Sequence, residues 1–436
     1  MRLSDFFKKV LFTLKIQFRP EYYGFVQGHS YLTNYQINQI KNLTKEPNYE
    51  LVKQFEKEFS SLIGNGKAIS FAAGRMAFYS LMKLMKIGIG DEVILLGSTC
   101  SVMPNAVLRT GAEPIFADID KNTFGSSAIE IEKKITSNTK MIVAQHSFGI
   151  PCNISEIVDL GRRKNIFVLE DCAITFDSTC NGIKVGNFGD AAIFSFDHSK
   201  PINTLVGGMF YTINSDLYDE MKTYTKNINS LTLKHQERLF KQLLWEKKYY
   251  SPLKYNRGIL LNYFRTRLFP KKNGYIFFEA DYSNKSSNEK KSYPYPAKLP
   301  SFLAQLGLFE LEKWKGEKKL RIELLEKYKQ LSKELNLVKY LPNSYYDKRL
   351  EIVPLRFVFA YPESKNIKRK LSKYLDISWF WFQEPVITCK NPIELKYEYG
   401  SCNTAEILGK DIINVPCVIP YIYQNKLLNI FQSCFK

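Results

Sequence analysis

The sequence has no long apolar run, no paired metal-binding motif and no internal repeat. No window approaches the roughly 18 uninterrupted apolar residues of a membrane-spanning helix, so we expect any contact with a membrane to be peripheral. The eight cysteines are scattered without a C-x-x-C pair or a histidine at metal-ligand spacing, which favours a reduced cytosol and no metal site. Lysines interrupt the apolar residues of the first twenty positions without a small-residue cleavage site, so we expect no signal peptide.

Acidic residues are also in deficit, because 43 Asp and Glu face 62 Lys and Arg, and the 436 residues carry a formal charge of +19. The apolar fraction of 45% is that of an ordinary globular protein and excludes global disorder. A chain of this length has room for about two to three domains. The basic balance permits nucleic acid, an anionic membrane or phosphorylated substrates as partners without choosing among them.

Short apolar runs alternate with stretches of helical spacing in the first half of the chain. We expect seven strands, at 68–71, 92–97, 113–118, 141–145, 166–171, 191–196 and 208–212. Helical spacing between the first five, as at 76–85 and 154–163, is typical of β-α-β units around a mostly parallel sheet. Ligands of such sheets bind at the carboxyl ends of the strands.

The domain organisation follows from changes in this rhythm. We expect a basic amphipathic extension at 1–33, a large α/β domain at 34–213, a basic aromatic-rich insertion at 214–292 and a smaller α+β domain at 293–436. Helical spacing also predicts helices within 34–63 and over 302–335. The polar run at 283–292 is expected to be an exposed loop.

Three features fall at or just beyond the ends of expected strands. The AAGRM turn, with Gly74 and Arg75, places backbone amides at the start of a helix, either to hold a phosphate or only to pack. Asp171 ends an almost wholly apolar strand, where it either needs a specific partner or caps the next helix. In SFDHSKP, Ser195 and Lys200 follow a strand, and the lysine is either a solvated cation or a Schiff-base amine.

Each of these features by itself is a weak indication of a cofactor site, but the three together match the groups that a single cofactor requires. Pyridoxal phosphate needs a lysine for the Schiff base, an aspartate at the pyridinium nitrogen and donors for the phosphate. Three separate strand ends supply these groups, a convergence that is harder to reach by chance than any one of them. The residues therefore indicate a single site at the carboxyl edge of the sheet.

The stretch 64–212 resembles the DegT-type sugar aminotransferases, a branch of the fold-type I pyridoxal phosphate enzymes. The resemblance rests on AAGRMAF, IGIGDEVILLGSTC, NAVLRTGAEPIFADID, SNTKMIVAQHSFGIPCNISEI, VLEDCAITFDS, KVGNFGDAAIFSFDHSKP and GGMFYT. Weaker similarity continues through 299–314 and the terminal EILGKDIINVPCVIP. The resemblance implies a fold-type I architecture, with a mostly parallel seven-stranded sheet in the large domain and a smaller C-terminal α+β domain.

The same resemblance implies residue roles. Lys200 stands at the position of the Schiff-base lysine, where some dehydrating relatives have histidine. Asp171 matches the carboxylate that pairs with the pyridine nitrogen. Ser195 and the turn of Gly74 and Arg75 match phosphate-binding positions.

The chain departs from the family pattern at three places. Cys100 takes the position of an aromatic side chain that stacks on the cofactor ring, and Ile174 stands where many members have glutamine. Relatives complete the site with an asparagine of a partner subunit just before the LPSF-like helix, whereas this chain has Pro296 and Lys298 there. Ring packing and substrate contacts are therefore expected to differ from those of relatives.

The resemblance implies a cytoplasmic homodimeric aminotransferase. An amino-acid donor, glutamate by family analogy, would supply an amino group for a nucleotide-linked keto sugar in surface glycan or polysaccharide synthesis, with Lys200 forming the internal aldimine and moving the proton. The alternatives are a sugar dehydratase or non-catalytic homologue of the same fold and, from another class, a basic nucleic-acid-binding protein. Since no nucleic-acid module is recognised, we expect no nucleic-acid partner.

The positive charge lies outside the expected catalytic domain. Residues 64–213 hold fourteen basic and fourteen acidic side chains, whereas 221–291 hold sixteen against five. Cations alternate with large apolar residues in this segment and in residues 1–20, which predicts a peripheral membrane or partner-docking face, at the inner side of the membrane for a cytoplasmic enzyme. The alternative is that the apolar residues dock on the protein's own body.

Overall fold

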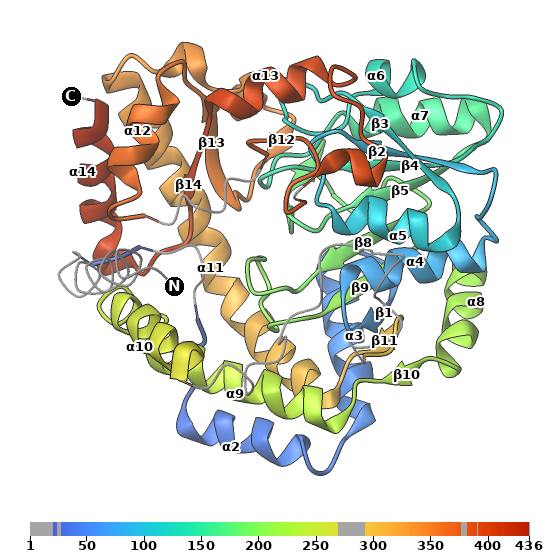
Figure 1. The fold of residues 1–436 in the computed structure, drawn as a ribbon, viewed down its shortest axis with the longest axis horizontal. Coiled ribbons are helices and arrows are strands. Elements are labelled where there is room, and N and C mark those ends of the chain that lie inside the picture. The colour runs from blue at the N-terminus through green and yellow to red at the C-terminus, as the bar shows by residue number, and fades with distance from the viewer. Residues whose placement is uncertain (1–20, 24–27, 269–292, 376–381, 390, 436) are drawn as a thin grey trace.

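The computed structural model describes residues 21–23, 28–268, 293–375, 382–389 and 391–435 (Figure 1). A nine-stranded sheet forms its centre, in the order β10-β11-β1-β9-β8-β5-β4-β2-β3. The strands are β1 (Lys67–Phe71), β2 (Glu92–Leu96), β3 (Glu113–Ala117), β4 (Thr139–Gln145), β5 (Phe167–Asp171), β8 (Ala191–Ser195), β9 (Gly208–Thr212), β10 (Asn229–Ser230) and β11 (Ala297–Lys298). All seven expected strands are confirmed, and the two-residue strands β10 and β11 extend the sheet.

The strand directions are mostly parallel. Strands β3, β2, β4, β5 and β8 pair in parallel, and β9 runs antiparallel to both of its neighbours, β8 and β1. Successive β-α-β crossovers produce this pattern, and they bring the carboxyl ends of β1, β2, β5 and β8 to one edge. The expected mostly parallel sheet is therefore confirmed.

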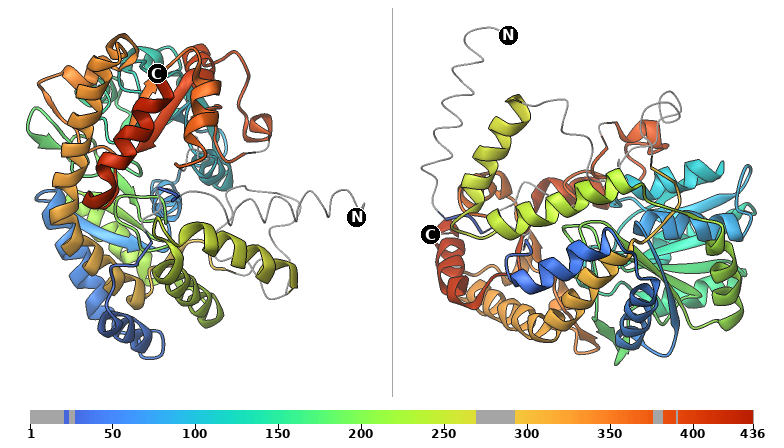
Figure 2. Two further views of the ribbon diagram at one scale, coloured as in Figure 1. Left: turned by 90° about the vertical axis from the view of Figure 1, so that its left-hand side faces the viewer. Right: turned by 90° about the horizontal axis from the view of Figure 1, so that it is seen from below.

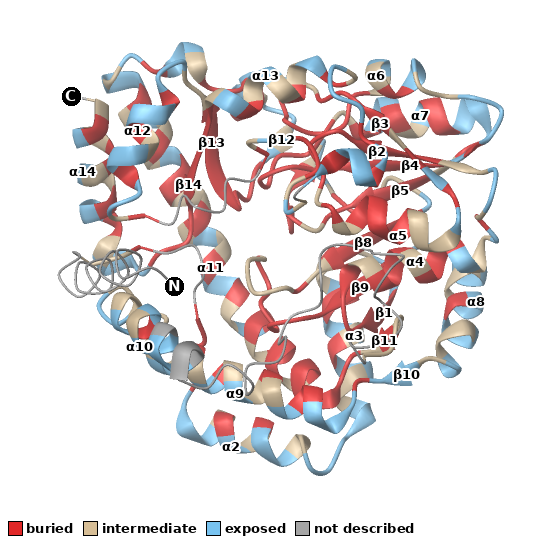
Figure 3. Cartoon of the chain, viewed as in Figure 1, coloured by how far each residue is buried: buried red, intermediate tan, exposed pale blue. Residues whose placement is uncertain are grey.

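Helices cover both faces of the sheet. Alternate residues of β2 and β4 point to opposite sides, so Ile94 and Ile142 belong to one apolar cluster and Val93 and Val143 to another. The first face packs against α7 (Ile154–Lys164) and α6 (Ala128–Glu132), and the second against α4 (Gly74–Leu84) and α5 (Val102–Thr110). The strands are buried along most of their length (Figure 3), which explains their nearly continuous apolar sequences.

The expected helical regions on either side of the sheet are present. Residues 34–63 form α2 (Asn34–Leu43) and α3 (Tyr49–Ile63), and α11 (Ser301–Glu334) is a single 34-residue helix. The region after β9 is helical where it is described, with α8 (Ser215–Lys226), α9 (Leu233–Tyr249) and α10 (Tyr255–Leu268). Helix α10 projects from the body of the molecule (Figure 2).

A smaller unit follows α11. Strands β13 (Arg356–Ala360) and β14 (Ile412–Pro416) pair antiparallel and pack with α12 (Ser364–Leu371), α13 (Asn403–Asp411) and α14 (Gln424–Phe435). Strand β12 (Leu350–Glu351) joins β6 (Thr179–Cys180) and β7 (Ile183–Lys184), which belong to the large unit. Single 3-10 turns occur at Val338–Tyr340, Asn343–Tyr346, Pro392–Leu395 and Tyr421–Tyr423.

Some expectations fall on residues that the structure does not describe. The amphipathic helix within 1–20 and the polar loop at 283–292 both lie outside the described residues. The domain boundaries at 33/34, 213/214 and 292/293 remain predictions. Within the described part of the chain, no helix is long and apolar enough to cross a membrane.

Candidate active site

The predicted site residues lie at the carboxyl edge of the sheet. Gly74 and Arg75 begin α4 directly after β1, and Cys100 follows β2. Asp171 is the last residue of β5 and Ser195 the last of β8, and Lys200 lies in the loop between β8 and β9. The β-α-β topology therefore brings these residues, which span more than a hundred positions of sequence, to the same side of the sheet.

The start of α4 forms a close-packed cradle. The N-cap residue of the helix is Ala73, whose side chain cannot accept a hydrogen bond from the first turn. The helix therefore presents backbone amides to the edge of the sheet. A Cβ on Gly208 would lie 2.1 Å from the Gly74 amide nitrogen. A Cβ on Gly74 would in turn lie 2.9 Å from the carbonyl oxygen of Phe194 and 3.4 Å from the Cβ of Ser195. Only glycine permits this approach, which places Ser195 beside the helix start.

Asp171 is a buried carboxylate with a defined backbone partner. Its side chain accepts a hydrogen bond from the Ala173 amide at 2.9 Å, and its residue is only 4% exposed. Burial raises the pKa of Asp171, although the Ala173 amide and the charge of Lys200 oppose that rise. A buried carboxylate at a strand end favours a cationic partner. The backbone of Asp171 is also anchored, because the amide of His146 donates to the Asp171 carbonyl oxygen at 3.1 Å.

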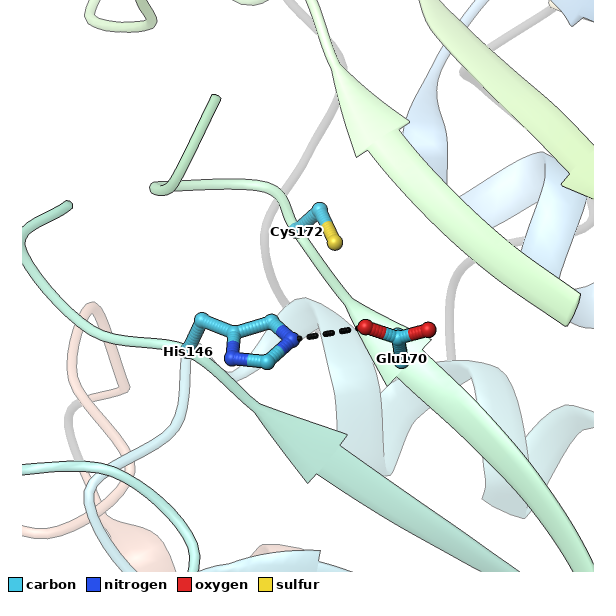
Figure 4. A group of neighbouring side chains, drawn as sticks. All are labelled: His146, Glu170 and Cys172. Atoms are coloured by element: carbon cyan, nitrogen blue, oxygen red, sulfur yellow. Dashed lines mark hydrogen bonds and ion pairs between the residues drawn. The ribbon is translucent and has the colours of Figure 1, made fainter. Parts of the chain in front are cut away.

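Three buried groups with metal-ligating atoms lie next to Asp171 (Figure 4). The ligand atoms of His146, Glu170 and Cys172 lie within 4.8 Å of one another. His146 accepts the Cys152 amide at Nδ1, at 3.1 Å, and its Nε2 donates to Glu170 at 3.0 Å, which assigns the neutral imidazole tautomer. The Glu170 carboxylate also accepts hydrogen bonds from the backbone amides of Gly186, Phe188 and Gly189, at 2.7, 2.7 and 2.8 Å.

These hydrogen bonds explain the cluster as a structural support. The carboxylate of Glu170 is satisfied by one imidazole and three backbone amides, so its oxygens already have partners without an ion. The bonds tie the turn before β8 to the ends of β4 and β5. We therefore assign the cluster to the positioning of the strand end that carries Asp171.

Lys200 lies in a mixed electrostatic environment. Burial lowers the pKa of its amine, and the charges of Asp197 and Asp171 oppose that effect. The Cys100 side chain also opposes it, whereas Arg75 lowers the pKa further, and the net pKa lies below the usual value. These interactions place the amine among the residues that the sequence predicted. A lowered pKa increases the neutral, nucleophilic form of the amine near neutral pH.

Asp197, which was not among the site residues predicted from the sequence, belongs to the same environment. His198 donates its backbone amide to the Asp197 carboxylate, and its Nδ1 makes a second, very short contact with the same oxygen. Burial raises the pKa of Asp197, but His198, Lys200 and Arg75 lower it to about 2. The position of Asp197 between Ser195 and Lys200 in SFDHSKP could have indicated this role, because a carboxylate close to a candidate amine shifts the pKa of that amine.

The small C-terminal unit reaches the site through residues 386–388. The amide of Ile387 donates to the Thr99 carbonyl at 2.9 Å, and that of Ser101 donates back to the Ile387 carbonyl at 2.9 Å. The Thr388 hydroxyl lies 3.5 Å from the Cys100 sulfur and 2.8 Å from the Ser101 hydroxyl. Cys100 thus contacts the second unit, a contact with no local signal in the sequence. Ile174, the other departure after Asp171, is buried in the main apolar core.

Lys298, in the segment before α11, makes its contacts away from the loop that carries Lys200. Lys298 pairs with Phe71 through β11, and its Nζ donates to the Lys226 carbonyl at 3.2 Å, at the end of α8. Tyr295 lies nearer to the cradle, since its hydroxyl is 3.4 Å from the Arg75 carbonyl. The Arg109 guanidinium lies over the Tyr295 ring at 4.3 Å. An aromatic–cation pair therefore borders the helix start.

Curated proteins of known name match part of the chain. GDP-perosamine synthase of Escherichia coli O157:H7 is 40% identical over 177 residues, which cover 41% of this chain and 48% of that protein. The Bacillus subtilis (strain 168) spore coat polysaccharide biosynthesis protein SpsC is 37% identical over 171 residues, which cover 39% of this chain and 44% of that protein. The chain thus spans about half the length of the curated relatives it matches.

Solved structures extend the similarity of fold to nearly the whole chain. An aminotransferase from Psychrobacter cryohalolentis superimposes with a TM-score of 0.69 at 20% identity, covering 93% of this chain and 97% of that one. Bacillus subtilis NtdA, solved with bound cofactor PMP, has a TM-score of 0.64 at 18% identity and covers 93% and 83% of the two chains. The fold is therefore that of these aminotransferases, with the expected fold-type I architecture.

The family model described as the DegT/DnrJ/EryC1/StrS aminotransferase family matches residues 33–244. This range contains Gly74, Asp171, Ser195 and Lys200, together with all of the strands that carry them. By sequence, residues 33–244 of this chain match the DegT/DnrJ/EryC1/StrS aminotransferase family, and the fold of the chain is that of the aminotransferases of known structure.

Proposed function

We propose that this protein is a pyridoxal phosphate-dependent aminotransferase that transfers an amino group to a nucleotide-linked keto sugar. The observation that carries the proposal is the meeting of an amine, a buried carboxylate and a glycine-lined helix start at one edge of the sheet. Lys200, Asp171 and Gly74 supply these three groups. Each has the chemistry that one part of the cofactor requires.

The residues fit the cofactor in two respects. The start of α4 has no side-chain cap, and the mutual approach of Gly74 and Gly208 leaves its first residue without a Cβ, which suits a phosphate cradle built from backbone amides. Asp171 is a buried carboxylate that a cationic ring nitrogen would neutralise. Ser195 and Arg75 adjoin the cradle and would add donors to the phosphate.

The protein residues would then have separate tasks. When bound, the cofactor supplies an electron sink for bonds at the amino-bearing carbon. Lys200 would bind it through Nζ and, once released, would carry the proton between two carbons as a neutral amine. Asp171 would keep the ring nitrogen protonated. Arg75 and Asp197 would set the charge around the amine, since both act on its pKa.

The amino donor and acceptor are proposed from the relatives. We infer glutamate as the donor, and a nucleotide-linked keto sugar for surface glycan or polysaccharide synthesis as the acceptor. The names of two relatives, a GDP-perosamine synthase and a spore coat polysaccharide biosynthesis protein, support this substrate class. Cys100 and Ile174 occupy positions where relatives differ, so ring packing is proposed to be particular to this chain.

An absorbance experiment tests the proposal. The purified protein, supplied with pyridoxal phosphate, should develop a visible band that bleaches on addition of glutamate. Lys200→Ala should lose the band, whereas Lys327→Ala, which removes a lysine that bonds Gln424 on the far helices, should keep it. Wild-type protein without a band, or a Lys200→Ala protein that responds to glutamate as the wild type does, would refute the assignment.

We also propose that the enzyme is a homodimer and that α10 contributes to a peripheral membrane contact. Arg257, Leu261 and Phe264 follow one another at helical spacing on α10 and are exposed, which combines positive charge with apolar side chains. Light scattering with size exclusion tests the dimer, since a monomeric mass would exclude it.

Liposome co-sedimentation tests the membrane contact. Vesicles rich in phosphatidylserine should bind the full chain in a salt-sensitive manner. Leu261→Glu combined with Phe264→Glu should reduce binding, as should deletion of residues 1–20, whereas Ile89→Glu should not, although Ile89 is 93% exposed. Equal binding by all variants, or none by the wild type, would exclude this surface.

A further inference from the structure

His29 is a fully buried imidazole whose two ring nitrogens both face oxygen atoms. Nδ1 lies 2.9 Å from the Glu246 carboxylate, and Nε2 lies 2.9 Å from the carbonyl oxygen of Asn203. A carbonyl oxygen only accepts hydrogen bonds, so Nε2 carries a proton, and a carboxylate at Nδ1 favours a second one. The arrangement is therefore a buried imidazolium–carboxylate pair with a charge-assisted bond to Asn203.

Glu246 comes from α9, in the region that the sequence marked as a basic insertion. Its side chain is fully buried, and its second oxygen accepts from Gln242 at 3.1 Å. The segment of His29 packs directly on the C-terminal end of this helix, because a Cβ on Gly28 would lie 2.1 Å from the Cβ of the C-cap residue Tyr250. Lys247 also donates to the Leu32 carbonyl at 2.7 Å. Helix α9 and residues 28–32 thus form one continuous support.

Asn203 belongs to the loop that carries Lys200. Its amide lies 3.3 Å from the Glu310 carboxylate of α11, and its side chain accepts from the Leu205 amide at 2.9 Å. Leu205 has a φ of +70°, a left-handed conformation that is costly for a leucine and needs support from its surroundings. The loop is therefore held at Asn203 from two sides, by α9 through His29 and by α11 through Glu310.

We propose that the buried His29–Glu246 pair is a positioning device that fixes the Lys200 loop against α9. Both residues lie outside the matched range 33–244, so the support comes from parts of the chain that flank the family segment. Figure 1 shows α9 beside α2 and the first half of α11, beneath the sheet edge. His29 and Glu246 are positioning residues, and the proposal rests on the proposed role of Lys200.

The charge on His29 makes this support dependent on pH. Burial lowers the pKa of His29, but the hydrogen bond and charge of Glu246, the charge of Glu310 and the Asn203 carbonyl together raise it above its usual value. The other titratable groups near the pair include His198 of the Lys200 loop, on which the charge of Glu246 acts, Tyr31, which donates to Glu310, and Lys313, which pairs with Glu310 at 3.0 Å. A raised pKa means that the support is complete at low pH and is lost as the pH rises through the folded-state pKa.

Hydrogen exchange with peptide-level mass spectrometry tests the proposal on the full chain. Glu246→Gln keeps the shape of the side chain but removes its charge, and His29→Gln keeps one donor for Asn203. Each should raise exchange of the amides in 198–206 by about tenfold or more, since a buried charged hydrogen bond is lost. Asp177→Asn removes another buried carboxylate, paired with Lys184 and Lys318, and should leave these amides unchanged.

The pH profile separates positioning from general stability. After correction for intrinsic exchange, protection of 198–206 in the wild type should fall as the pH rises, and in Glu246→Gln the fall should occur at lower pH. Unchanged exchange in both variants, or the same pH midpoint in wild type and Glu246→Gln, would overturn the proposal. So would faster exchange throughout α9 that leaves the loop protected.

This test is independent of the cofactor. Exchange of the loop is measured on the protein with and without added pyridoxal phosphate. If the wild type develops no visible band but the variants still release the loop, the proposed function fails while the positioning role holds. A normal band in the wild type, with variants whose loop exchanges as the wild type does, leaves the function intact and refutes the positioning role.

Discussion

Gly208 of β9 lies directly against Gly74 at the start of α4, so closely that a Cβ at position 208 would come within 2.3 Å of the Gly74 Cα. The contact joins the antiparallel strand β9 to the only turn that separates β1 from α4. It therefore sets how near the amides of the helix start lie to Ser195, the partner of Gly208 in the sheet.

Gly208→Ala should weaken binding of pyridoxal phosphate by about tenfold or more, because overpacking of about 1–3 kcal/mol pushes the helix start away from the strand. Absorbance titration measures the affinity and thermal unfolding measures the stability. Gly316→Ala is the matched control, since a Cβ there meets no atom within 4 Å. It should bind normally and unfold at the same or a higher temperature, and an equal loss of affinity in both variants would contradict the cradle.

Asp171→Asn should lower kcat by about a hundredfold or more, since the neutral amide cannot hold a proton on the cofactor ring. The fold should survive, because an asparagine oxygen can still accept the Ala173 amide. Asp190→Asn, at the opposite end of the sheet, makes the same chemical change where the carboxylate accepts the Val168 amide. Steady-state kinetics should show full activity for that control, and comparable losses in the two variants would argue against the role of Asp171.

Asp197 should make a measurable contribution to stability on the acid side. Its pKa is lowered from 3.8 to about 2, so the contribution is present above 3.8 and is lost as the pH falls toward 2. Asp197→Asn should therefore be less stable than the wild type near neutral pH, and the difference should shrink in that window. Urea unfolding at several pH values measures it, with the exposed Asp216→Asn as control. A pH-independent difference would exclude the paired carboxylate.

The cysteines should react in two groups. Cys100, Cys180 and Cys389 are partly exposed, whereas the other five are buried, and burial raises the pKa of Cys172 and Cys417 to about 12. Iodoacetamide should therefore modify the first three in the native protein and the rest only on unfolding. Bound pyridoxal phosphate should slow modification of Cys100 and not of Cys180, as peptide mass spectrometry can show. Equal rates at Cys100 with and without the cofactor would place it outside the site.

The sequence predicted the sheet because its strands are buried on both faces and therefore read as short apolar runs. Runs such as 92–97 and 191–196 became β2 and β8, and the helical spacing between runs implied parallel crossovers. Parallel crossovers in turn bring strand ends together, so Gly74, Asp171 and Lys200 were expected on one edge before their surroundings were known. The local signals were sufficient there because periodicity and turn chemistry act within a few residues.

Other features depend on contacts that no local pattern encodes. Thr388 reaches Cys100 across 288 positions, and His29 meets Glu246 across 217, on a helix whose composition suggested only a basic surface. The roles of Asn203 and Leu205 depend on the contacts that their loop makes with His29, beside α9, and with Glu310 of α11. The sequence by itself determined the strands, the parallel topology and the residues with reactive groups, because these follow from local periodicity and chemistry. Only the tertiary structure decided which distant segments hold those groups in place, because burial pairs a charge with whatever partner the packing brings within hydrogen-bond distance.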